Sequence, residues 1–103
     1  MENKKIILWG VGGNESDGQI LLNYLTMNSI KIYGVVDRDT RRQGAIVNGY
    51  KIEKPFPFYQ EADYIIVTSN WIYQEICSTV KDTGIVVVDL LEMLMERERK
   101  RNL

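Results

Sequence analysis

Apolar residues in this chain fall into short continuous runs, separated by stretches in which apolar positions recur every three or four residues. The runs at 6–9, 31–36, 64–68 and 85–89 have the length and β-branched content of buried strands. The last run is the most apolar, so we expect it to be central in the sheet or well covered. Strands that alternate with helices predict an α/β fold with a parallel sheet and right-handed connections.

The first helical segment begins after Ser16, which forms a capping-box pattern with Gln19. Helical spacing continues to about residue 27, and five apolar side chains are expected to face the sheet: Ile20, Leu21, Tyr24, Leu25 and Met27.

Two further helices are predicted, at 71–81 and 90–101. The first has an inner stripe of Ile72, Ile76 and Val80, and Gly84 stands where a glycine ends a helix. The second ends in cations, which the helix dipole favours at that position. We expect it to bury Leu90, Leu91 and Leu94, together with Met93 and Met95.

Two shorter segments complete the pattern. Asn48-Gly49, between β-prone pairs at 45–52, predicts a type I′ hairpin. The prolines within 54–58 argue against regular structure there. The expected spatial order is the hairpin at the edge, then the second, first, third and fourth apolar runs, with helices on both faces. All 103 residues then form one domain.

The transition from the first strand to the first helix contains Gly10, Gly12 and Gly13. Glycines at such a turn let backbone N–H groups approach a phosphate at the positive end of a helix. However, Glu15 and Asp17 add two carboxylates, and the turn is three residues longer than the dinucleotide pattern requires. A turn that keeps its glycines for geometry alone is therefore the competing interpretation.

Polar residues follow the neighbouring strands at the same edge of the sheet. Asp37 stands where a carboxylate can accept both hydroxyls of a ribose, although it could equally cap a turn. Arg38 is a candidate for stacking on a base or holding a phosphate. Ser69 and Asn70 end the third run, across the expected crevice from the glycines, and Trp71 could cover that crevice.

Composition narrows the function classes. The chain contains no histidine and one cysteine, Cys77, which we expect to be a buried small hydrophobe. We therefore expect no metal site and no catalysis by the isolated chain. A formal charge of −1 gives no field that would attract nucleic acid or a membrane surface. No secretory or membrane-spanning stretch is visible, which favours a cytoplasmic location.

Four segments resemble the Rossmann-like N-terminal domain of bacterial sugar-nucleotide and surface-polysaccharide enzymes. They are 7–13, 32–39, the glycine pattern from Gly44 to 49–52, and 63–69. The similar families include nucleoside-diphosphate-sugar epimerase-like proteins and PglD-type acetyltransferases. The resemblance implies a single Rossmann-like domain with a parallel sheet of about four strands and an edge hairpin.

The same resemblance implies a nucleotide ligand, either NAD or the UDP of a sugar nucleotide. By position, Gly10, Gly12, Gly13 and Asn14 would contact phosphate, and Asp37 would contact ribose or base. The tyrosine–lysine pair of short-chain epimerases has no counterpart, because Cys77 stands four residues after Tyr73. Redox chemistry on a sugar is therefore not expected of this chain alone.

Three functional hypotheses follow. The first is a non-catalytic module that binds a sugar nucleotide or NAD within a polysaccharide-biosynthesis protein. The alternative is a structural or protein-interaction module with a degenerate nucleotide site, which would assemble through its final helix as a homodimer or with a fused domain. The third and weakest hypothesis is a complete small enzyme.

Overall fold

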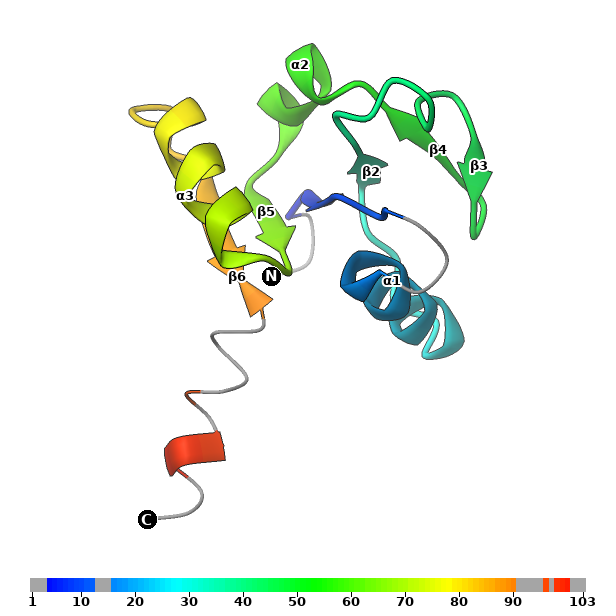
Figure 1. Ribbon diagram of the computed structural model, residues 1–103, viewed down its shortest axis with the longest axis horizontal. Helices are drawn as coiled ribbons and strands as arrows, with labels where there is room; N and C mark the ends of the chain where they lie inside the picture. The colour runs from blue at the N-terminus through cyan, green and yellow to red at the C-terminus, as the bar shows by residue number, and fades with distance from the viewer. Residues whose placement is uncertain (1–3, 13–15, 91–95, 97, 101–103) are drawn as a thin grey trace.

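The structure, a computed structural model, describes residues 4–12, 16–90, 96 and 98–100, without the side chains of residues 70 and 71. Within these residues the chain forms one six-stranded sheet with the order β3-β4-β2-β1-β5-β6 (Figure 1). Neighbouring strands are parallel except for the β3–β4 pair. The protein is thus a small α/β domain with a mixed, mostly parallel sheet. The strands are β1 (Ile6–Trp9), β2 (Gly34–Val36), β3 (Ile46–Val47), β4 (Tyr50–Glu53), β5 (Tyr64–Val67) and β6 (Val86–Asp89).

The expected spatial order of the strands and the hairpin is confirmed. Asn48 and Gly49 both have positive φ, 50° and 87°, as a type I′ turn requires. β4 pairs with β2 in parallel, so the hairpin extends the sheet. The second strand is shorter than the predicted run 31–36, and the Ile32 amide donates to the side-chain hydroxyl of Tyr50 rather than to a backbone carbonyl.

Helix α1 (Asp17–Met27) covers one face of the sheet. Its N-cap is confirmed, since the Ser16 hydroxyl accepts from the Gln19 amide at 3.1 Å. Leu22 is fully buried in a cluster with Leu8, Val11, Val35 and Ile52.

The predicted inner stripe of α1 is wrong for three side chains, because Ile20, Tyr24 and Met27 are exposed. The physical reason is a close helix–strand contact. A Cβ built on Gly18 would lie 1.8 Å from the Gly10 carbonyl oxygen, so the Gly18 side of the helix faces the sheet. Leu22, one turn further on the same side, then enters the core.

The opposite face is covered by α2 (Pro55–Phe58), the 3₁₀ helix η1 (Tyr59–Glu61) and α3 (Asn70–Thr79). Ile76 and Val80 are buried in the cluster on this face and Ile72 packs against it, which confirms the predicted inner stripe of the second helix. The expectation of no regular structure at 54–58 is met only in part, because α2 is a single short and interrupted turn. Pro55 is compatible with the first turn of a helix, although Phe56 inside α2 has a non-helical backbone.

The end of α3 also differs from the expectation. The helix ends at Thr79, two residues before the predicted boundary, and Asp82 takes a left-handed conformation with φ 67°. Gly84, with φ 85°, shapes the following turn to β6 rather than ending the helix.

β6 lies at the edge of the described sheet and is neither central nor well covered, contrary to the expectation. It pairs with β5 alone, and Val86 is 50% exposed. Val87 of this strand packs against the buried cluster that contains Ile76 and Val80. The predicted helix at 90–101, including Leu91, Met93, Leu94 and Met95, lies largely outside the described residues.

Candidate functional site

The carboxyl end of β1 leads into a glycine turn that the rest of the structure holds tightly. The Gly10 amide donates to the Val36 carbonyl at 2.8 Å, which ties the turn to β2. Gly10 and Gly12 have φ values of 92° and 48°, a region that side chains rarely adopt. The contact between Gly18 and the Gly10 carbonyl brings the start of α1 directly against this turn.

Asp37, the first residue after β2, binds the glycine turn. Its Oδ2 accepts from the amides of Val11 and Gly12, both at 3.3 Å. Its Oδ1 accepts from the Asp39 amide at 2.9 Å, and the side chain is 13% exposed. The structure thus brings together Gly10, Gly12 and Asp37. The two loop amides that could face a phosphate donate to a carboxylate of the chain itself.

Two residues of the following loop, Arg42 and Gln43, were not predicted as site residues. Arg42 Nε lies 3.9 Å from Asp37 Oδ2; it is buried and has no hydrogen-bond partner among the described residues. The side-chain amide of Gln43 donates from Nε2 to the backbone carbonyl of Asp37 at 2.9 Å. The charged sequence of 38–44 is typical of a solvated loop and does not indicate these contacts.

Arg38 and Asp39, which directly follow Asp37, both form ion pairs. Arg38 forms an ion pair with Glu75 on α3. Asp39 is bound by Arg41, whose Nε and Nη2 each donate to a different carboxylate oxygen at 3.0 Å. This hydrogen bonding lowers the pKa of Asp39 below its usual value and raises that of Arg41.

Of the two residues predicted across the crevice from the glycines, Ser69 is described in full and Asn70 only in its backbone. Ser69 is the N-cap residue of α3 by position, but its side chain accepts no hydrogen bond from the helix. By the pairing of Leu8 with Ile66, Ser69 follows at the level of the glycine turn. Gly13 and Asn14 lie outside the described residues, as does Glu15, and the Asn70 side chain is not described.

Tyr73 and Cys77 lie one turn apart on α3. The interaction of the Tyr73 hydroxyl with the Cys77 side chain raises the pKa of the tyrosine. Cys77 is a free thiol and half-buried, so the expectation of a buried side chain is met only in part. A raised pKa makes the phenol a weaker acid and keeps it protonated near neutral pH, which gives no support for acid–base chemistry here.

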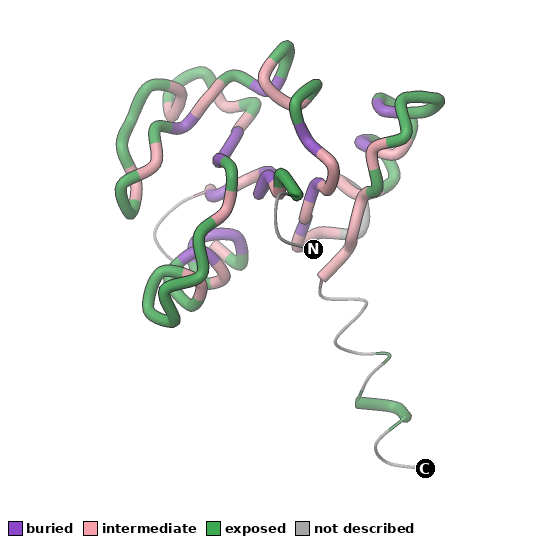
Figure 2. The backbone as a smooth tube through the Cα atoms, turned by 180° about the vertical axis from the view of Figure 1, so that it is seen from behind, coloured by how far each residue is buried: buried purple, intermediate pink, exposed green. Residues whose placement is uncertain are grey.

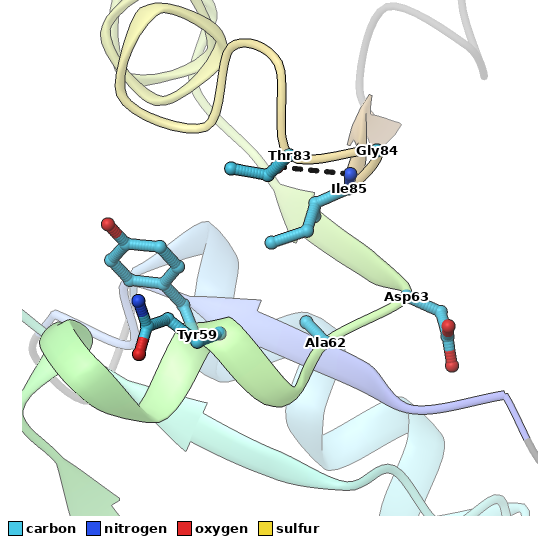
Figure 3. A pocket seen from close by; sticks show the side chains of 7 residues that line it. Tyr59, Ala62, Asp63, Thr83, Gly84 and Ile85 are labelled. Carbon is cyan, nitrogen blue, oxygen red and sulfur yellow. Dashed lines mark hydrogen bonds between the residues drawn. The ribbon is translucent and has the colours of Figure 1, made fainter.

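A cavity of about 360 Å³ lies at the opposite, amino-terminal edge of β5 and β6 (Figure 3). The turn before β6 forms one wall and η1 the other. Asp63 points away from the cavity and accepts from the Lys5 amide at 2.7 Å. The lining residues are Tyr59, Gln60, Ala62, Asp63, Thr83, Gly84 and Ile85. None of them belongs to the predicted site, so this cavity is separate from the glycine turn.

Across the described residues, no group of three or more acidic, cysteine or histidine side chains is placed to hold a metal ion. In the same part of the chain, no helix has both the length and the apolar character needed to cross a membrane.

Fold and site together define a small α/β domain in which an aspartate after β2 holds a glycine turn after β1. The sequence model of the C2185-like N-terminal domain family matches residues 2–88, which is most of the chain. The chain therefore belongs to this family. No curated protein shows a significant match.

Proposed function

We propose that this domain is a Rossmann-like nucleotide-binding module without catalytic activity of its own. Its ligand would be a sugar nucleotide or NAD, and it would serve a protein of sugar-nucleotide or polysaccharide biosynthesis. The observation that carries the proposal is the position of the Asp37 carboxylate, which lies against the amides of Val11 and Gly12 at the carboxyl end of β1.

The strand order supports a binding crevice at this edge. β1 lies between β2 and β5. After β1 the chain continues to β2 and β4 on one side of it, and it then crosses back to β5 and β6 on the other side. The cores under α1 and α3 are on opposite faces of the sheet (Figure 1). Open α/β sheets bind ligands at such a reversal point, beyond the carboxyl ends of the strands.

The hydrogen bonds of Asp37 can be exchanged when a ligand binds. Its two contacts with the turn are 3.3 Å long, beyond the usual 2.7–3.2 Å for N–H···O bonds. A ribose can donate its hydroxyls to this carboxylate, and a phosphate can then accept from the loop amides that Asp37 releases. Arg42 Nε, buried and 3.9 Å from the same oxygen, would balance the added negative charge.

Calorimetric titration with NAD, UDP and a UDP-sugar tests the proposal. Asp37→Asn keeps one carbonyl acceptor for the loop amides but removes the charge and the second ribose acceptor. Hydrogen bonds to a charged group contribute about 1.5–3 kcal/mol, so affinity should fall about tenfold or more. Asp63→Asn is the matched control, because Asp63 also accepts a backbone amide, at the other edge of the sheet.

A nucleotide that binds the wild type and the Asp63→Asn variant, but binds Asp37→Asn more weakly, is the expected outcome. Equal affinity of all three proteins, or no binding to the wild type at millimolar ligand, would contradict the proposal.

The second candidate is an interaction module whose nucleotide site is degenerate. The observation in its favour is that Asp37 already accepts from the two amides that a phosphate would need. In this case the wild type binds none of the three nucleotides, while Asp37→Ala still destabilises the fold by about 1–3 kcal/mol through its unpaired amides.

A further inference from the structure

Arg42 differs from the other two arginines of the loop between β2 and β3, because its Nε has no hydrogen-bond partner among the described residues. Arg38 forms an ion pair with Glu75, and Arg41 donates from its Nε to Asp39. The Arg42 side chain is also the least exposed of the three, at 29% against 46% and 88%. In Figure 2 this loop mixes exposed and partly buried residues.

A suitable acceptor for the Arg42 Nε lies just out of reach. A buried donor without a partner costs free energy, and native proteins leave few of them. Asp37 Oδ2 is 3.9 Å away, about 1 Å farther than in a charge-assisted hydrogen bond. That oxygen already accepts from the amides of Val11 and Gly12. The turn amides therefore occupy the acceptor that the Arg42 Nε lacks.

We propose that Arg42 is a positioning residue that makes the site selective for nucleotides over nucleosides. The inference rests on the proposed nucleotide site. When a phosphate accepts from the amides of Val11 and Gly12, Asp37 Oδ2 loses both donors, and the Arg42 Nε moves by about 1 Å to replace them. The new ion pair neutralises the carboxylate beside the phosphate, so Arg42 acts on the ligand through Asp37.

The charge of the ligand decides when Arg42 is needed. A nucleoside offers its ribose hydroxyls to Asp37 and has no group that competes for the turn amides, so the contacts of the free protein persist. A phosphate places negative charge close to the carboxylate, and like charges at such a separation repel. A guanidinium that moves onto the carboxylate offsets this repulsion. Nucleotide affinity therefore depends on Arg42, whereas nucleoside affinity does not.

The Nε–H resonances of two neighbouring arginines report on this movement. They are followed by ¹H–¹⁵N NMR of the full chain during titrations with UDP and uridine, and with ADP and adenosine. We expect the Arg42 resonance to shift downfield with saturation as UDP or ADP binds, and to stay in place with either nucleoside. Arg41 is the internal control, because its Nε already donates to Asp39 Oδ1 at 3.0 Å.

Substitution of Arg42 tests the selectivity itself. Arg42→Gln removes the charge and should weaken UDP or ADP binding about tenfold, while nucleoside affinity changes by less than about twofold. Arg41→Gln is the matched control, since it removes the same charge from the same loop. It should leave the ratio of nucleotide to nucleoside affinity unchanged.

The inference is overturned if the Arg42 resonance stays in place while a nucleotide binds. It is also overturned if Arg42→Gln weakens nucleosides and nucleotides equally, or if Arg41→Gln has the same effect on selectivity. When Asp37→Asn weakens nucleotide binding and Arg42→Gln does not, the proposed site stands and the role of Arg42 is wrong.

If none of the four ligands binds the wild type, the proposed site and the role of Arg42 are both wrong. If Arg42→Gln fails to fold, the Arg42 resonance of the wild type still decides.

Discussion

The close contact between Gly18 and the Gly10 carbonyl allows Gly18→Ala to test directly how α1 is placed against the sheet. In an ordinary helix position, Gly→Ala stabilises by about 0.5–1 kcal/mol. Here the new methyl group would lie 1.8 Å from a backbone oxygen, which cannot rotate away as a side chain could. To reach 3.0 Å the helix must retreat by roughly 1.2 Å, the difference between the two distances. That movement also loosens the contacts of Leu22 with the sheet.

Overpacking of this kind costs about 1–3 kcal/mol, and the lost Leu22 packing adds to it, so we expect Gly18→Ala to destabilise by about 2–4 kcal/mol. Urea unfolding followed by far-ultraviolet circular dichroism measures the change. Gly44→Ala is the control: with φ 90° and no atom within 4 Å of its added Cβ, it has backbone strain without a clash. That strain amounts to about 1–2 kcal/mol. A Gly18→Ala protein as stable as the wild type would refute this placement of the helix.

Three further predictions concern stability. Leu22→Ala should lower the free energy of unfolding by about 2–5 kcal/mol, whereas Ile20→Ala should change it by less than about 0.5 kcal/mol; equal effects in urea unfolding would contradict the orientation of α1. Tyr50→Phe should destabilise by about 1 kcal/mol, since a backbone amide loses its acceptor. The pKa of Asp39 is lower in the folded state than its unfolded value of 3.8. The ionised Asp39 therefore contributes to the free energy of unfolding above pH 3.8, and this contribution is lost as the pH falls through the folded pKa. An NMR titration should give a midpoint below 3.8 that Arg41→Ala returns towards it; an unchanged midpoint would contradict the ion pair.

The sheet could be predicted because its strands are encoded locally. Continuous apolar runs gave the four long strands, and Asn48-Gly49 specified a turn that only positive φ values allow. The order expected for a doubly wound sheet, with the second and third long strands on either side of the first, is the order that the structure has.

The rotation of α1 could not be predicted from periodicity. Apolar residues occur on several sides of this helix, so the spacing of Ile20, Tyr24 and Met27 fits a buried stripe as well as Leu22 does. The rotation of the helix depends instead on the tertiary contact of Gly18 with the Gly10 carbonyl, which the helix's own periodicity does not contain. Similarly, the exposure of β6 depends on which elements cover it, and a strand's own composition does not contain that information.

The site was predicted in its residue types but not in its contacts. Position alone placed Gly10, Gly12 and Asp37 at one edge of the sheet. That the carboxylate would accept from the turn amides themselves depends on the height of β2 relative to β1, set by the pairing of Trp9 with Val36. Arg42 reaches Asp37 only through the folded loop, so its proximity has no local signal.

Backbone amide shifts most directly test the proposal that Asp37 and the glycine turn form a nucleotide site. The amides of Val11, Gly12 and Asp39, which donate to Asp37, should shift with saturation as UDP, a UDP-sugar or NAD is added. The Lys5 amide, bound to Asp63 at the other edge, should stay in place. If none of the three amides moves with any of these ligands, or if Lys5 moves equally, the claim is contradicted.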